Sequence, residues 1–375
     1  MSQRIQDFVP PSCELLALGE PTHLEPACQL LRNELFGQLV EHGFRSIALE
    51  TDRVAALAVD DFVRAGVGTL DAAMSDGFSH RFGELDGNRR LVAWMREYNE
   101  HRPAEERLAF HGFDAPTETL NAPSPRRYLE HTRDYLGLDL DIAGLAGDDE
   151  RWNSQEAILD ATRSPGATAD AERLRGVGDD LLTSLYTRAP ELIAKTSRAT
   201  WLRARTYVTA GLFLLRYHRQ SAQRIDETAR INRLCALRDA FMAQNLLDLR
   251  DTEARRGPML VFAHNLHLQR NPSHMRMGPY EVDWHSAGAI VAPLLDERYT
   301  FIAGSLGRSD ALSLHEPEPG TYESFLRDRT TGWRLAKAAA VPSASTRTDP
   351  TPEQGYFPLD EPTLDGADAV LYLSD

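Results

Sequence analysis

The feature that most constrains the fold is a repeated succession of a short apolar run, a helical period and another short apolar run. Leu31, Leu35 and Leu39 recur at helical spacing within residues 26–42, and residues 91–99 show a second helical pattern. We expect buried strands at residues 13–18, 46–49, 108–110, 258–263, 299–303 and 369–373. Strands alternating with helices predict an α/β fold, with a mainly parallel central sheet flanked by helices.

The middle of the chain has a different pattern. From residue 116 to residue 256 helical periods follow one another without a convincing strand, and residues 191–219 and 223–256 each predict one long helix. We therefore divide the chain into an α/β catalytic core, 1–115 and 257–375, and an inserted all-helical subdomain, 116–256, that roofs the active-site cleft. Residues 341–363, rich in Pro, Thr and Asp, predict an ordered surface loop or lid.

Charge and composition exclude several classes of function. The chain has 41 basic and 56 acidic residues, and its net charge of −15 repels nucleic acid and anionic membrane surfaces. Three widely spaced cysteines, Cys13, Cys28 and Cys235, predict neither a disulfide framework nor a Cys-rich zinc site. Because the sequence has no apolar signal core and no run of about 18 apolar residues, we expect a cytoplasmic protein. Its expected partner is a small-molecule substrate, and it is expected to be a monomer or a homodimer.

Ionisable side chains follow four of the predicted strands. In strand order they are Glu20 and His23, then Glu50 and Asp52, then His111 and Asp114, and finally His264 and His267 with Asn265 between them. A parallel sheet brings the carboxyl ends of its strands to one edge, where α/β enzymes bind their ligands. These side chains are therefore expected in one cleft.

Two helices carry polar side chains whose role the pattern leaves open. Arg238 and Asn245 fall on the apolar stripe of the helix before the fourth strand, with Asp239 beside it, and a buried charge needs a partner. We favour a structural network behind the site over residues that line it. Arg32, on the first helix, either pairs in solvent with a neighbouring Glu or reaches back toward the turn that holds His23.

The segment 272–288 predicts a connecting loop with adaptable and aromatic side chains. Met277 and Tyr280 belong to this set, which suits a bulky organic substrate, although a loop packed on its own small core would have the same composition. The predicted substrate contacts are Met275, Trp284 and His285 in this loop, together with Asn265, His111 and Asp114 at the strand ends.

Five sequence features occur in a fixed order along the chain: G-E-P-T-H at 19–23, Arg32, G-F-x-x-I-A-L-E at 43–50, R-D-x-x-M-A-x-N at 238–245 and A-H-N-x-H at 263–267. This ordered set of motifs resembles the erythromycin esterase family. The resemblance covers residues 14–307 and implies an α/β core with a helical subdomain. It also implies hydrolysis by a water molecule that a histidine activates, without a serine nucleophile. By resemblance His23 is the general base, and the site is completed by Glu20, Arg32, Glu50, His264 and His267.

The chain departs from the family pattern at two places. Leu24, Glu25 and Pro26 follow the first histidine where many members have Gly, which reshapes the pocket wall beside the base. Gln244 stands where the later motif usually carries Glu, which removes a charge. Neither change deletes a group of the implied site, but both leave open whether the substrate is a macrolide.

The residue types themselves suit acyl transfer to water. An imidazole with a pKa of about 6.5 accepts a proton at neutral pH, and Arg32, His264 and His267 offer donors to an oxyanion. The stretch A-G-S-L-G at 303–307 lacks the first Gly of a nucleophile elbow, so water is the simpler nucleophile. We therefore expect a hydrolase of an ester, a lactone or a related carbonyl bond in a bulky small molecule, such as a macrolide or another natural product.

Three other interpretations remain at this point. His264 and His267, with His23, Glu20 and Glu50, offer enough ligands for zinc or manganese in a metal-dependent hydrolase, although we expect no metal and no cofactor. The same groups suit a biosynthetic enzyme that opens an epoxide, eliminates or cyclises. A protein that binds a small molecule without turning it over is the third.

Overall fold

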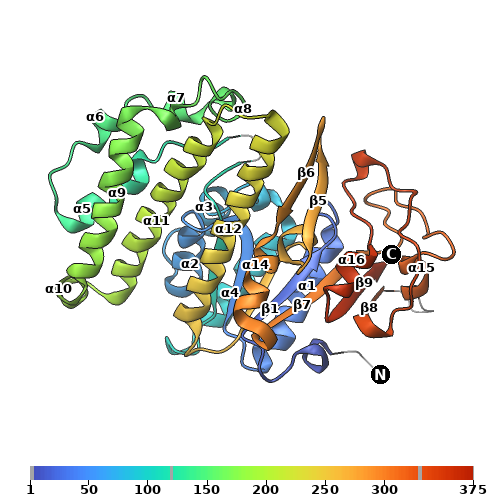
Figure 1. The fold of residues 1–375 in the computed structure, drawn as a ribbon. Helices are drawn as coiled ribbons and strands as arrows, with labels where there is room; N and C mark the ends of the chain where they lie inside the picture. The colour runs from blue at the N-terminus through green and yellow to red at the C-terminus, as the bar shows by residue number, and fades with distance from the viewer. Residues whose placement is uncertain (1–3, 119–120, 328–331, 375) are drawn as a thin grey trace.

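The computed structural model describes residues 4–118, 121–327 and 332–374, and it shows an α/β fold (Figure 1). Residues 1–3, 328–331 and 375 of the expected core and residues 119–120 of the expected helical subdomain lie outside the described residues. Within these described ranges seven strands form one sheet in the order β3-β2-β4-β1-β7-β9-β8, and only β8 runs antiparallel to its neighbour there. Their bounds are β1 Leu15–Glu20, β2 Ser46–Asp52, β3 Ala109–Asp114, β4 Met259–His264, β7 Tyr299–Leu306, β8 Gly332–Lys337 and β9 Ala369–Ser374. The predicted parallel sheet flanked by helices is confirmed.

All six predicted strands are present, and each ends later in the chain than its apolar run does. The last residues of β1, β2 and β4 include Glu20, Glu50 and His264, because ladder hydrogen bonds use the backbone and do not require apolar side chains. The same extension places His111 inside β3 and not after it. The sequence analysis missed β8, an antiparallel edge strand.

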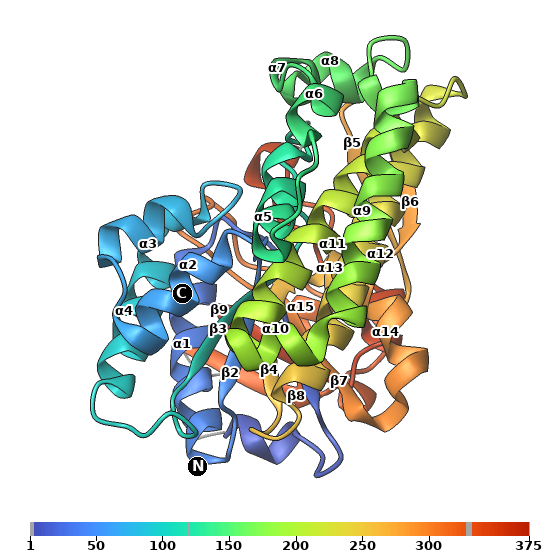
Figure 2. The ribbon, with the colours of Figure 1, turned by 90° about the vertical axis from the view of Figure 1, so that its left-hand side faces the viewer.

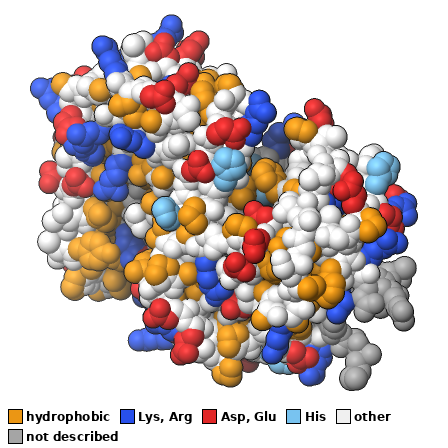
Figure 3. Space-filling model, turned by 45° about the vertical axis from the view of Figure 1, so that its right-hand side comes forward, with side chains coloured by type: hydrophobic (Ala, Val, Ile, Leu, Met, Phe, Trp, Pro, Cys, Tyr) orange, Lys and Arg blue, Asp and Glu red, His pale blue; other side chains and the backbone are white. Residues whose placement is uncertain are grey.

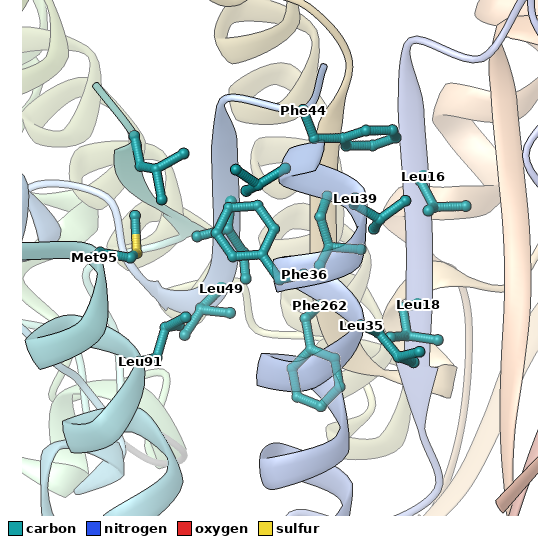
Figure 4. Packing of buried hydrophobic residues seen from close by; sticks show 14 of the residues in the cluster. Leu16, Leu18, Leu35, Phe36, Leu39, Phe44, Leu49, Leu91, Met95 and Phe262 are labelled. Carbon is teal, nitrogen blue, oxygen red and sulfur yellow. The ribbon is translucent and has the colours of Figure 1, made fainter. Parts of the chain in front are cut away.

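Two layers of helices cover the sheet. Leu35 and Leu39 of α1 pack against Leu16 and Leu18 of β1 on one face (Figure 4). Met242 of α12 packs on the opposite face, since successive strand residues point to opposite sides. The first layer contains α1 Pro26–Glu41, α2 Ala56–Ala65 and α4 Asp86–Asn99, with α3 Leu70–Asp76 and the 3₁₀ turn η2 Phe82–Glu84 beside α2 and α4. The second contains α12 Glu227–Glu253 and α14 Ala287–Leu295.

In the described part of residues 116–256, the regular structure consists of helices joined by loops, together with one isolated β-bridge. The helices are α5 Arg126–Leu136, α6 Ile142–Ala146, α7 Glu150–Asn153, α8 Gln155–Leu159, α9 Ala169–Thr187, α10 Ala189–Lys195, α11 Arg198–Ser221 and α12. The helices α5, α6, α7, α9, α10 and α11 share an apolar cluster of their own, and α9, α11 and α12 run side by side (Figure 2). The expectation of one helix over 191–219 is wrong: Ser197 caps α11 through its side chain and separates it from α10.

The segment predicted as a loop over 272–288 is mostly an antiparallel hairpin, which is a correction. Its strands are β5 Pro272–Met277 and β6 Tyr280–His285, and it stands beside α12 (Figure 1). Trp284 is buried, and Met275 packs in an apolar cluster with residues of α11 and α12. His285, which alternates with Trp284, is exposed.

The segment 341–363 has little regular structure, with only the short turn η6 Pro352–Gln354 and the start of α16 Glu361–Asp365. It is nevertheless packed, because Tyr356 and Leu359 are buried. The ring of Phe357 lies 4.8 Å from that of His264, edge to face. This segment therefore covers one side of the carboxyl edge of the sheet. No helix formed by the described residues is both long and apolar enough to cross a membrane.

Asn265 ties the end of β4 to β7, across β1, at that edge. It begins α13 Asn265–Leu268, and its amide donates to the carbonyl of Gly304 at 2.8 Å and accepts from the Gly304 N–H at 2.9 Å. The side chain occupies the space above Gly19, where a Cβ atom would stand 2.0 Å from Asn265 Oδ1. A glycine at position 19 therefore leaves room for the Asn265 side chain.

We expect Gly19→Ala to lower the free energy of unfolding by about 1–3 kcal/mol, since the added methyl group must displace the Asn265 amide. Urea unfolding of the variant and the wild type measures the difference. Gly37→Ala is the matched control: no atom lies within 4 Å of the added methyl group in the middle of α1, so this change is expected to stabilise by about 0.5–1 kcal/mol. Equal effects of the two changes would contradict the packing account.

Candidate functional site

The carboxyl edge of the three central strands brings together the ionisable residues that the sequence singled out. The order β2-β4-β1 makes these strands neighbours, and Glu20 and His264 face each other in the register of β1 and β4. His23 follows β1 directly, and His267 lies in α13 after β4. Residues about 240 positions apart thus form one cluster, as the strand-end pattern predicts.

Glu50 is the centre of this cluster. Its Oε2 accepts the backbone N–H of His264 at 2.9 Å, and its Oε1 lies 3.3 Å from both His267 Nε2 and an Arg238 nitrogen. Oε2 also lies 3.8 Å from His23 Nε2. Burial alone would raise the pKa of Glu50, but the two histidines and Arg238 outweigh it and hold the pKa well below its usual range. Glu50 is thus a buried carboxylate.

His267 is locked between two carboxylates. Its Nδ1 lies 2.9 Å from Asp239 Oδ1, opposite the Glu50 contact of Nε2. Asp239 is fixed in turn by the N–H groups of Trp284, at 2.9 Å, and Ala287, at 2.8 Å. Burial lowers the pKa of His267, but Asp239 and Glu50 more than compensate and raise it to about 10. His267 is therefore an imidazolium at neutral pH.

His23 is the histidine of the cluster that solvent reaches. Its side chain is 30% exposed, against 11% for His267, and its Nδ1 lies 2.8 Å from Glu20 Oε1. The ring lies between Phe82, at 4.9 Å, and His264, at 5.3 Å. Burial lowers the pKa of His23, but Glu50 and Glu20 raise it above the ordinary value. A carboxylate thus orients an accessible imidazole.

His264 has the opposite electrostatic character. Burial, and then the neighbouring His23, lower its pKa to about 3, so the ring is neutral. Because its Nδ1 accepts the backbone N–H of Leu266 at 3.2 Å, the ring proton belongs on Nε2. A neutral imidazole that carries a proton on Nε2 is a donor suited to a developing oxyanion.

Arg32 is buried, and the alternative of a solvated arginine is wrong. Its guanidinium donates to Asn88 at 2.9 Å and to Asn33 at 2.7 Å, and it lies 4.8 Å from the centre of the Phe262 ring. Burial lowers its pKa to about 10. Arg32 is thus held by side chains of α1 and α4, and no direct hydrogen bond to His23 is formed.

A cavity of about 20 Å³ lies between Glu20, Arg32 and Glu50. This volume is enough for about one water molecule. Glu20 Oε2 is buried and has no hydrogen-bond partner among the described residues. Burial raises the pKa of Glu20, although His23 and Arg32 oppose that effect.

Arg238 lies closer to the site than a purely structural residue would. Its guanidinium donates to Asp114, with Nε 2.9 Å from Oδ1, and the same guanidinium also donates to Glu50. Asn245 stays behind the site, where it donates to the Phe113 carbonyl and accepts from Arg53. The structure thus joins Arg238 and Asp239 directly to the cluster and leaves Asn245 outside it.

Several predicted substrate contacts lie elsewhere. His111 points away from the edge to Glu253, 3.1 Å away, because it lies inside β3. Both amide atoms of Asn265 bind the backbone of Gly304. Trp284 supports Asp239, Met275 packs against the helices and His285 is exposed.

The sequence analysis missed His80. It lies between α3 and η2, outside the strand-end pattern, and its Nε2 lies 3.0 Å from Asp114 Oδ2. Burial lowers the pKa of His80, but Asp114 and Glu118 raise it to about 9. The only local signal was its place in a polar turn just before Phe82.

The molecular surface shows no single field of one charge on the face drawn in Figure 3, where acidic and basic side chains are interspersed. Over residues 4–118, 121–327 and 332–374, no group of three or more His, Cys, Asp and Glu side chains has the arrangement of a metal site.

The fold and the site together define a class of protein: an α/β protein with an accessible, carboxylate-oriented histidine above buried charges at the carboxyl edge of a parallel sheet. The chain belongs to the erythromycin esterase family, whose sequence model matches residues 39–368. The match includes Glu50 and the segment from Arg238 to His267, whereas Glu20 and His23 precede it. Family membership supports an esterase-like hydrolase.

Individual proteins resemble the chain in sequence or in fold. Erythromycin esterase type II of Escherichia coli is 24% identical over 342 residues, which cover 83% of this chain and 77% of that protein. A mutant of the erythromycin esterase EreC, solved in its open conformation, has a similar fold, with a TM-score of 0.67 at 20% identity over 96% of this chain and 90% of that one. A Bacillus cereus protein gives a TM-score of 0.66 at 16% identity, over 99% and 91%.

The protonated His267 predicts a pH dependence of stability. Its pKa of about 10 in the folded protein lies above the value of about 6.5 in an unfolded chain, so the bound proton stabilises the fold fully below pH 6.5. That contribution is lost as the pH rises to 10. We expect the free energy of unfolding, from urea titrations at each pH, to fall more steeply over this range in the wild type than in His267→Gln. Parallel curves would contradict the assignment of the proton to His267.

Proposed function

We propose that the protein hydrolyses an ester or lactone bond in a bulky small molecule, with His23 as general base toward water. The observation that carries the proposal is the geometry of His23, whose ring is accessible and is fixed through Nδ1 by Glu20 at 2.8 Å. That contact leaves Nε2, on the side of Glu50, to accept a proton. Glu20 and Glu50 then stabilise the imidazolium that forms.

The chemical steps follow from the charges around the base. His23 takes a proton from water as the water oxygen bonds to the carbonyl carbon of the substrate, and the negative charge moves to the carbonyl oxygen. The Nε2 proton of the neutral His264 is suited to stabilise that oxyanion. When the intermediate collapses, the bond to the leaving oxygen breaks, and His23 returns its proton to that oxygen.

The first substrates to test are macrolide lactones, because the relatives are named erythromycin esterases. Leu24, which follows the base, is 58% exposed and stands beside Gly355 of the segment that covers the site. This apolar side chain beside His23 suits a bulky apolar substrate. Turnover in ¹⁸O-labelled water, followed by mass spectrometry, identifies hydrolysis by label in the carboxylate product.

His23→Ala is expected to lower kcat about 10²–10⁴-fold, because the reaction loses its proton acceptor. The fold is expected to remain intact, since the side chain is partly exposed and follows the end of β1. His42→Ala is the matched control: His42 is an exposed histidine whose ring Nδ1 bonds to the Gln38 carbonyl at the end of α1, and loss of this ring is expected to leave kcat unchanged. If His23→Ala retains more than about a tenth of the wild-type rate, another group is the base.

We also propose that this reaction needs no metal ion. Support comes from the partners of the imidazoles: His267 binds carboxylates through both nitrogens, and Nδ1 of His264 accepts a backbone N–H. Dialysis against a chelator is expected to leave kcat unchanged, and elemental analysis is expected to find less than one zinc or manganese per chain. Loss of activity on chelation, with recovery on adding one of these metals, would contradict this proposal.

A further inference from the structure

We propose that His80 is a positioning residue of the site: through Asp114 it holds Arg238 against Glu50, and so fixes the charge that faces His23. The inference deepens the proposed function and rests on it for one of its two readouts. His80 belongs to none of the motifs that carry the family resemblance.

A chain of alternating charges links His80 to the site. It begins at Glu118, which is half exposed and lies 3.0 Å from His80 Nδ1. Nε2 of His80 lies 3.0 Å from Asp114 Oδ2, and Asp114 receives the fork of Arg238. Arg238 reaches Glu50 at 3.3 Å. Each member of this chain therefore has its neighbours as partners, and Arg238 is shared between Asp114 and Glu50.

The backbone around His80 is strained and firmly anchored. His80 and Arg81 have φ values of 56° and 60°, in the left-handed region that residues other than Gly rarely adopt. The His80 N–H faces both oxygens of Glu118, at 3.1 and 3.2 Å. One residue earlier, Ser79 bonds to Thr51 through its backbone N–H at 2.8 Å. Contacts on both sides thus hold the imidazole in this unusual position.

The same segment also touches the proposed base. The ring of Phe82 lies 5.6 Å from that of His80 and 4.9 Å from that of His23. One short segment therefore orients His23 through a ring contact and Arg238 through Asp114. A histidine that served only to stabilise the turn would not require this second connection.

Loss of the positive charge on His80 is expected to make the site around Glu50 more negative. Asp114, Glu118 and Arg238 face His80, and its raised pKa makes it a cation at neutral pH. Without that cation Asp114 is less compensated and draws Arg238 toward itself. Glu50 then presents more negative charge to the site.

The groups that face His23 are Glu20, Glu50, His264 and His267. More negative charge at Glu50 stabilises the protonated form of His23, so the pKa of His23 rises. In an esterase that uses neutral His23 as its base, the acid limb of the pH–rate profile moves to higher pH by the same amount.

Two substitutions separate the charge of His80 from its conformation. His80→Asn removes the charge, but Asn tolerates the left-handed backbone and keeps a donor. His80→Lys restores a positive charge. His80→Gly, which relieves the strain at this φ, replaces the Asn variant if that variant does not fold.

The matched control is His274→Asn. His274 is also held by two carboxylates, Asp283 at 2.8 Å and Glu281 at 3.2 Å, but it lies on the exposed side of the hairpin. It shares no partner with Arg238 or Glu50 in the described parts of the chain. Its removal therefore tests the loss of a similar ion pair away from the site.

The first readout is an NMR titration of the His23 ring, whose signal is identified by its absence in His23→Ala. We expect His80→Asn to raise the pKa of His23 by about half a unit, as one charge acting through partly buried partners would. His80→Lys is expected to return it toward the wild-type value, and His274→Asn to leave it unchanged. The second readout is kcat on the acid limb, expected to fall about threefold in His80→Asn at unchanged KM.

An unchanged titration of His23 in both His80→Asn and His80→Gly would overturn the inference. So would a His80→Lys variant that shifts the pKa as much as the Asn variant does, because the charge of His80 would then have no part. The titration needs no substrate. A wild type without turnover on esters therefore counts against the proposed function, while the NMR shift still supports the role of His80.

Discussion

Burying Glu50 is the constraint on which the rest of the site depends. A carboxylate at the end of a central strand loses its hydration, and that cost must be offset by positive charges and N–H donors around it. The protein supplies them from separate elements: Arg238 from α12, His267 from α13 and the backbone N–H of His264 from the end of β4. The order of the strands, the position of α12 and the start of α13 all place a partner beside the Glu50 carboxylate.

The three histidines of the cluster around Glu50 differ in their electrostatic environment. His267 is held as a cation between Asp239 and Glu50, His264 is neutral because burial and His23 oppose its charge, and His23 is partly exposed, with its pKa raised by Glu50 and Glu20. Identical side chains are therefore held in different charge states because of the partners that each one has. The fold thus determines the chemistry more than the residue types do.

The sequence predicts the parallel sheet, the helices on its faces and the cluster of Glu20, His23, Glu50, His264 and His267, because apolar runs and the polar residues that end them are local signals. It does not predict that β3 extends far enough to place His111 inside the strand, since backbone pairing continues beyond the apolar run. The hairpin over 272–285 alternates buried and exposed residues, yet its buried positions are too mixed in polarity to stand out. The position of His80 depends on contacts between distant segments, and its only local signal is a polar turn before Phe82.

The place of β4 in the sheet has a consequence for how the molecule is assembled. β1 and β2 are made early in the chain, but they do not pair with each other, because β4 lies between them and is separated from them by the whole helical segment. The central ladder is thus closed only when residues 259–264 insert between two strands made long before. Such non-local pairing is slow, and until it happens both strands have an open edge. The event that closes those edges also brings His264 and its N–H to Glu50, so the cluster around Glu50 forms as β4 inserts into the sheet.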